Sequence, residues 1–165
     1  MGLPLLQTER MALLFIDVLR TYVAARKFRI NDFVVMPNHF HLLITLDGAT
    51  TVEKAVQLIK GNFSYRAKKE LGFQRDVWQR GFSDERIWDR ESFLWHRSYI
   101  DDNPVKAGLA RSAEEYPYCS AFFRKRKNRA SCGTTSQPLL SRCAGEHRAK
   151  RSSRALTLVS QGAKG

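Results

Sequence analysis

The chain has 165 residues and a formal net charge of +12, a length typical of one domain that excludes a multi-domain enzyme. Hydrophobic residues make up 43% of it and aromatic residues 11%, which is enough for a buried core, whereas the longest apolar runs are far too short to span a bilayer. We therefore expect a soluble protein that does not bind a membrane.

The first predicted elements are a helix and a pair of strands. Thr8 is a typical N-cap, and apolar residues recur after it at spacings of three and four up to residue 25, which predicts an amphipathic helix. Residues 28–35 are rich in β-branched and aromatic side chains, residues 36–38 interrupt them, and residues 39–46 resume an extended apolar pattern. We predict that the two strands form a hairpin.

Two further helices and one short strand are predicted up to residue 104. Thr50 and Glu53 have the spacing of a capping box, and Gly72 suits the left-handed end of the helix that follows. Residues 77–79 resemble a short strand, and Asp89 is placed to cap a third helix that Pro104 should end. The predicted order is helix, strand, strand, helix, strand, helix.

The last part of the chain has a different composition. Residues 124–165 carry 11 of the 28 basic residues and one of the 16 acidic residues, without any Phe, Trp or Tyr. Such a composition is typical of disorder. Solvation of the chain end, a mistranslated end, and non-specific attraction to nucleic acid all remain open as explanations. We divide the chain into a domain over residues 1–123 and a disordered basic tail over residues 124–165.

The three cysteines form no Cys-x-x-Cys pair, and no secretion signal is recognisable at the start of the sequence. We therefore expect the protein to reside in the reducing cytoplasm.

Two patterns carry candidate chemistry. On a strand, His39 and His41 point to the same face with α-carbons about 7 Å apart, so they are able to bind one ion. Two ordinary strand histidines are the alternative. Tyr99 and Asn103 share one face of the third helix. Taken alone, this pair is better explained as a packed aromatic side chain and a helix terminator before a proline, and only its combination with the histidines favours a chemical role.

The segment over residues 60–80 is basic and contains aromatic residues, which suits contacts with phosphates and stacking on unpaired bases. A solvated helix face is the alternative. The candidate DNA-binding residues are Lys60, Arg66, Lys68, Lys69, Arg75 and Arg80.

Four segments together resemble the REP-associated tyrosine transposases, which belong to the HUH (His-hydrophobe-His) single-strand transposases. These segments cover residues 34–41, 77–82, 99–109 and 116–120, and their order and spacing agree over roughly residues 5–123. The resemblance implies an α+β fold with a ferredoxin-like antiparallel sheet and a DNA partner that is single-stranded or forms a hairpin. It leaves the choice between monomer and homodimer open.

The resemblance also implies roles for the candidate residues. Tyr99 would be the nucleophile, and His39, His41 and Asn103 would hold a divalent metal, Mg²⁺ or Mn²⁺. A free tyrosine has a pKa of about 10, so it needs electrostatic help to attack a phosphate at neutral pH. Attack would leave a 5′-phosphotyrosine and a free 3′ hydroxyl. The sequence does not identify the residue that removes the phenolic proton; Asp101 and Asp102 are candidates, and a solvated acidic turn is the alternative explanation for them.

One departure concerns the start of the chain. Relatives have an additional strand before the first helix, beside the strand that carries the histidines, and we expect residues 1–7 to be too short to supply it. We therefore expect the strand of His39 to have a free edge unless another chain pairs with it. A catalytically inactive relative that binds structured DNA or RNA, and a structural module that self-associates, remain the alternatives to a transposase.

Overall fold

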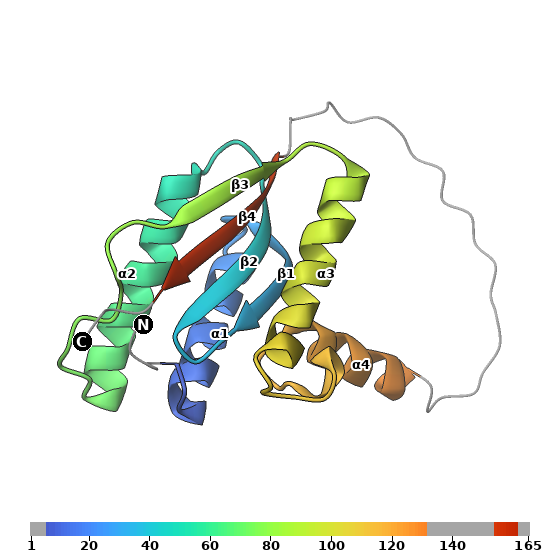
Figure 1. Cartoon of the computed structure of the whole chain (residues 1–165). Helices are drawn as coiled ribbons and strands as arrows, with labels where there is room; N and C mark the ends of the chain where they lie inside the picture. Colours follow the sequence, from blue (N-terminus) through green and yellow to red (C-terminus); the bar gives the residue numbers. More distant parts are fainter. Residues whose placement is uncertain (1–5, 132–153, 162–165) are drawn as a thin grey trace.

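The computed structural model describes residues 6–131 and 154–161, and it shows an α+β fold. In this part of the chain an antiparallel sheet of four strands has the order β1-β2-β4-β3 (Figure 1). The α+β, ferredoxin-like class expected from the sequence is confirmed. The elements are α1 (Glu9–Ala24), β1 (Arg29–Val35), β2 (His39–Leu46), α2 (Val52–Leu71), β3 (Ser83–Ile87), α3 (Arg90–Lys106), a 3-10 turn (Ala113–Glu115), α4 (Ser120–Ser131) and β4 (Arg154–Gln161).

The strand β4 comes from the region expected to be disordered. It pairs along its whole length with β2, from His39 opposite Gln161 to Leu46 opposite Arg154, and its other edge pairs with β3. The free edge expected for the His39 strand is therefore paired, by a segment of the same chain. The prediction of disorder is wrong for residues 124–131, which belong to α4, and for residues 154–161. Residues 1–5 and the rest of the tail lie outside the described residues.

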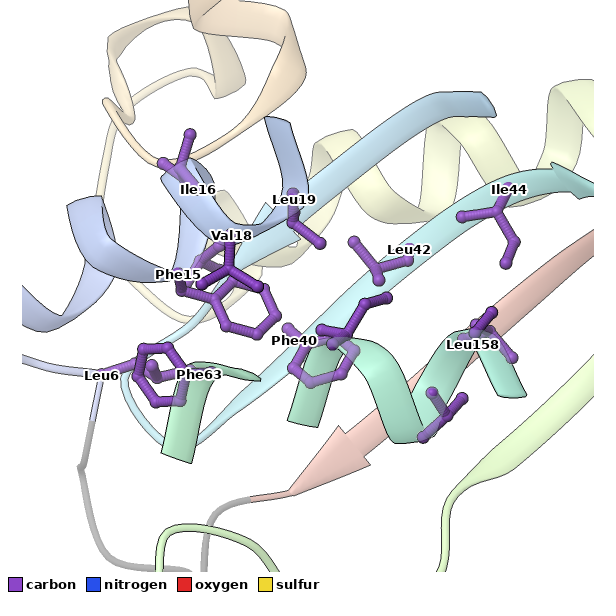
Figure 2. Packing of buried hydrophobic residues seen from close by; sticks show 14 of the residues in the cluster. Leu6, Phe15, Ile16, Val18, Leu19, Phe40, Leu42, Ile44, Phe63 and Leu158 are labelled. Atoms are coloured by element: carbon purple, nitrogen blue, oxygen red, sulfur yellow. The ribbon is translucent and has the colours of Figure 1, made fainter. Parts of the chain in front are cut away.

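Hydrophobic side chains on the two faces of the sheet form two separate cores. Phe40 and Leu42 of β2 and Leu158 of β4 face α1 and α2, where they pack against residues such as Phe15 and Phe63 (Figure 2). The residues between them in sequence face α3 and α4, because side chains alternate along a strand. Leu43 of β2, Val34 of β1 and Ile100 of α3 belong to this second core.

The helix boundaries agree with the sequence in part. Thr8 and Asp89 cap α1 and α3, and Gly72 ends α2 with a φ of +67°. The N-cap of α2 is Thr51 and not Thr50, because the Thr51 hydroxyl accepts the hydrogen bond from Lys54 N–H.

Two other predictions about the third strand and helix are wrong. The strand lies at Ser83–Ile87 and not at residues 77–79. Pro104 does not end α3, which continues to Lys106. A proline removes a single N–H from the helix, and carbonyls beyond that point still find partners, since Leu109 N–H donates to Pro104 O. Among the described helices, none has the length and apolar character needed to cross a membrane.

Candidate active site

The two strand histidines lie together on the face of the sheet that α3 covers. His39 Nε2 is 3.1 Å from His41 Nε2, and the two rings meet edge to face. His39 Nδ1 is 2.7 Å from the side-chain oxygen of Asn38. Because that oxygen only accepts, His39 carries its proton on Nδ1 and its Nε2 holds a lone pair. His41 then donates from Nε2, which leaves its buried Nδ1 without a partner among the described residues.

Both imidazoles are neutral at pH 7. Burial lowers the pKa of His39, and burial together with the neighbouring His39 lowers the pKa of His41 to about 4. Desolvation disfavours the charged form of an imidazole. Neutral imidazoles are the form that binds metal ions, so these two side chains are electrostatically prepared to act as ligands.

The spacing of the histidines also fits a shared ion. Two nitrogens that bind one ion at about 2.1 Å, at the right angle of an octahedral site, lie about 3.0 Å apart. For both Nε2 atoms to bind the ion, His41 would carry its proton on Nδ1 instead of Nε2. The described residues contain no cluster of three or more His, Cys, Asp and Glu side chains that could hold a metal. The remaining coordination positions would therefore have to come from other groups, such as an amide, water or phosphate oxygen.

Tyr99 reaches the histidines from α3. Its ring centroid is 5.5 Å from that of His41, in an edge-to-face arrangement, and the side chain is 37% exposed. Trp95, one turn earlier, stacks on the Tyr99 ring at 5.6 Å and 12°. Lys106 Nζ lies 5.7 Å from the Tyr99 centroid and 3.4 Å from Asp102. An accessible phenol thus lies beside two neutral imidazoles.

Asn103 lies on α3 one turn after Tyr99, as its spacing predicts. Its amide nitrogen donates to Tyr99 O at 2.7 Å. Among the described residues it makes no hydrogen bond to either histidine, so its predicted role as a third ligand stays a prediction. The amide oxygen is the only atom of this side chain that could bind a metal.

An ionic network around the buried Asp32 holds α3 against the sheet and α4. Asp32 of β1, at 1% exposure, bonds to Arg97 of α3 at 3.0 Å and to Arg124 of α4, and it accepts from the Ser120 hydroxyl at 2.7 Å. Arg124 also binds Asp101 of α3 at 2.6 Å. Burial is the main reason why the pKa of Asp101 is raised. Because Arg97 and Asp101 flank Tyr99 in sequence, this network fixes the helix turn that carries the phenol.

The predicted DNA-binding residues lie on α2 and in the loop that follows it, on the opposite layer from α3. Lys60 donates to Gln79 O and Gly81 O, and Arg66 pairs with Asp17 and Glu70. These two side chains therefore already have protein partners. The other four are exposed, and their DNA contacts stay predictions: Lys68, Lys69, Arg75 and Arg80.

Sequence reasoning missed three neighbours of the candidate catalytic groups. Asn38 was noted only as part of the break between strands, although it is the polar neighbour of a candidate ligand and such neighbours often orient histidines. Trp95 and Lys106 stand four residues before and seven residues after Tyr99, which are helical same-face spacings. That spacing was the available signal for both.

Comparisons with known proteins relate the chain to a family of transposases. A family model described as "Transposase IS200 like" matches residues 4–103. The REP-associated tyrosine transposase of Escherichia coli (strain K12) is 31% identical over 100 residues, which are 60% of this chain and 57% of the relative. A putative REP-associated tyrosine transposase of Haemophilus influenzae (strain ATCC 51907 / DSM 11121 / KW20 / Rd) is 30% identical over 100 residues, 54% of this chain and 56% of the relative.

A solved structure, described as the REP-associated tyrosine transposase bound to a REP hairpin, is also similar. Its TM-score is 0.59 at 26% identity, with 90% of this chain and 86% of that chain covered. In sequence, the chain spans a little over half the length of the curated relatives it matches.

Proposed function

Because the chain belongs to the family of IS200-like transposases, we propose that it cuts and rejoins single-stranded DNA near hairpins, with Tyr99 as the nucleophile. The observation that carries this proposal is the meeting of Tyr99 with His39 and His41, from segments about 60 residues apart in sequence, on one accessible face. A structural role for Tyr99 alone would not require neutral imidazoles beside it.

The proposed reaction conserves phosphodiester bonds. The Tyr99 oxygen attacks a phosphate in line, the bond from phosphorus to the 3′ oxygen breaks, and the proton lost by the phenol is balanced by the proton gained at the 3′ hydroxyl. The product is a 5′-phosphotyrosine. A 3′ hydroxyl of the same or another strand reverses the step, which releases Tyr99 and joins the strands without an external energy source.

His39, His41 and the Asn103 oxygen are the groups that would hold a divalent metal, Mg²⁺ or Mn²⁺. The separation of the two Nε2 atoms and the neutral state of both rings support this assignment. A bound divalent ion would polarise the phosphate and offset the charge that develops during attack. Asn38 would orient His39 through its Nδ1 hydrogen bond.

Hairpin DNA is the proposed substrate because the similar solved structure is described as bound to a REP hairpin. The four exposed cations that belong to neither core of the described residues would bind phosphates: Lys68, Lys69, Arg75 and Arg80. Binding of this kind weakens steeply with added salt.

The test is the polarity of a covalent adduct. The full chain is incubated with Mn²⁺ and a panel of hairpin oligonucleotides with single-stranded flanks, labelled at either the 3′ or the 5′ end, and separated on a denaturing gel. We expect protein-linked label from the 3′-labelled DNA alone, since the tyrosine keeps the 5′ phosphate. The 5′-labelled DNA should give a shortened fragment.

Tyr99→Phe and His41→Ala should abolish the adduct. Tyr22→Phe is the matched control, because Tyr22 packs beside Phe28 on the far layer and keeps its ring in the variant. An adduct that survives Tyr99→Phe, or that forms with the 5′-labelled DNA, would contradict the mechanism. Absence of an adduct over the whole panel would contradict the proposed activity.

A further inference from the structure

We propose that Trp95 is a stacking site for one unpaired nucleobase of the DNA strand whose phosphate Tyr99 attacks. The inference rests on the proposed function and adds to it a residue that selects and places the strand. The observation behind it is an indole that is parallel to the candidate nucleophile and yet 60% exposed.

The orientation of Trp95 is set by two ring contacts. One face of the indole lies against Tyr99 at 5.6 Å and 12°, and His96 meets it edge to face at 4.9 Å. His96 is itself 3% exposed and lies 3.7 Å from Glu85 of β3, so it is anchored in the protein. The indole is therefore held on a rigid helix with much of its surface in water, and little side-chain entropy remains to be lost on binding.

Trp78 shows how a tryptophan of the core is packed in this protein. Trp78 packs on Phe15, Phe40 and Phe63, and its indole N–H donates to Lys60 O. That ring is a core residue. Trp95 contributes to neither hydrophobic core, so packing does not account for a large aromatic side chain at this position.

The surroundings of Trp95 suit the binding of a nucleobase better than the binding of a purely apolar partner. Trp95, Tyr99 and Lys106 follow one face of α3, with the indole on the phenol ring and the ammonium group 5.7 Å from the same ring. A nucleotide offers a flat apolar base and a negative phosphate within one residue of each other. Stacking on the indole with the phosphate near the phenol and ammonium groups satisfies both features.

The test separates base stacking from catalysis. All variants are made in the Tyr99→Phe background, which keeps the ring that Trp95 contacts and removes the attacking oxygen. Affinity is measured by fluorescence anisotropy for a labelled hairpin with mixed-sequence single-stranded flanks. The same DNA is then prepared with one abasic position, moved through the flanks in turn.

We expect Trp95→Leu to weaken binding about tenfold, within the range known for loss of one stacked base, and Trp95→Phe to weaken it less. Trp88→Leu is the control, because Trp88 is 81% exposed and, among the described residues, makes no ring contact with Trp95, Tyr99 or the two strand histidines. It should change affinity less than twofold. One abasic position should reproduce the loss seen with Trp95→Leu. At that position the two changes should not add, because they remove the same contact.

Equal affinity of Trp95→Leu and its parent, or additive losses at every abasic position, would overturn the proposal. So would a change in sedimentation mass without a change in affinity, which would assign Trp95 to contact between copies of the chain. The outcome is independent of the adduct assay. An active wild-type protein with an unaffected Trp95→Leu variant rejects the stacking site alone, whereas normal binding without any adduct rejects the catalytic proposal alone.

Discussion

Because β4 lies between β2 and β3, we predict that substitutions of Leu42 and Leu158 have non-additive effects on the free energy of unfolding. These residues are opposite each other in the register of β2 and β4, and both are at most 1% exposed. Replacing either with Ala removes three carbon atoms, which costs about 2.4 kcal/mol in transfer free energy at about 0.8 kcal/mol per CH₂. With the cavity left behind, we expect each variant to lose about 3 kcal/mol of the free energy of unfolding.

The double variant distinguishes pairing from independent burial. Neighbouring side chains share one cavity, so the loss in Leu42→Ala/Leu158→Ala should differ from the sum of the single losses by at least about 0.5 kcal/mol. Urea unfolding followed by circular dichroism measures each free energy, provided that the slope with urea is unchanged. Leu13, at 49% exposure on α1, supplies the control. Leu13→Ala should cost under about 0.5 kcal/mol and should add to Leu158→Ala without coupling.

A small loss in Leu158→Ala, or strict additivity with Leu42→Ala, would refute the assignment of β4 to the centre of the sheet. The result also bears on the candidate active site. His39 and His41 are paired with β4 throughout, so a protein without this strand should lose the arrangement of the two imidazoles.

Three further variants test contacts around the site. Asp32→Asn removes the buried charge that Arg97 and Arg124 share. It should lower the free energy of unfolding by about 2–4 kcal/mol, and an unchanged urea midpoint would contradict a stabilising role for the network. Tyr116 is buried and donates to Val35 O, and burial raises its pKa from 10.0 to about 12. The folded state therefore disfavours the phenolate, so the free energy of unfolding should fall as pH rises from about 10 to 12. Urea titrations at each pH should show a smaller fall for Tyr116→Phe, and an equal fall would contradict this role of Tyr116. Asn38→Ala removes the hydrogen-bond partner of His39 and should raise the Mn²⁺ concentration for half-maximal adduct about tenfold; an unchanged Mn²⁺ dependence would argue against metal binding through this ring.

Local sequence signals determined most of the elements near the candidate site. Alternation on the strand placed His39 and His41 on one face, and helical spacing placed Tyr99 and Asn103 on another element, because both periodicities follow from backbone geometry alone. The caps at Thr8 and Asp89 and the left-handed end at Gly72 were equally local. Helix ends that depend on neighbouring contacts, such as the one after Pro104, were less well determined.

The tertiary structure decided what brings these elements together. No local pattern relates Tyr99 to His41, since their contact depends on how α3 packs on the sheet through Ile100 and through the Asp32 network. The role of β4 was also hidden, although Leu156 and Leu158 alternate with Thr157 as in a half-buried strand. A single strand gains its stability from partners that are distant in sequence. Composition therefore indicated disorder for a segment that two neighbouring strands hold in the middle of the sheet.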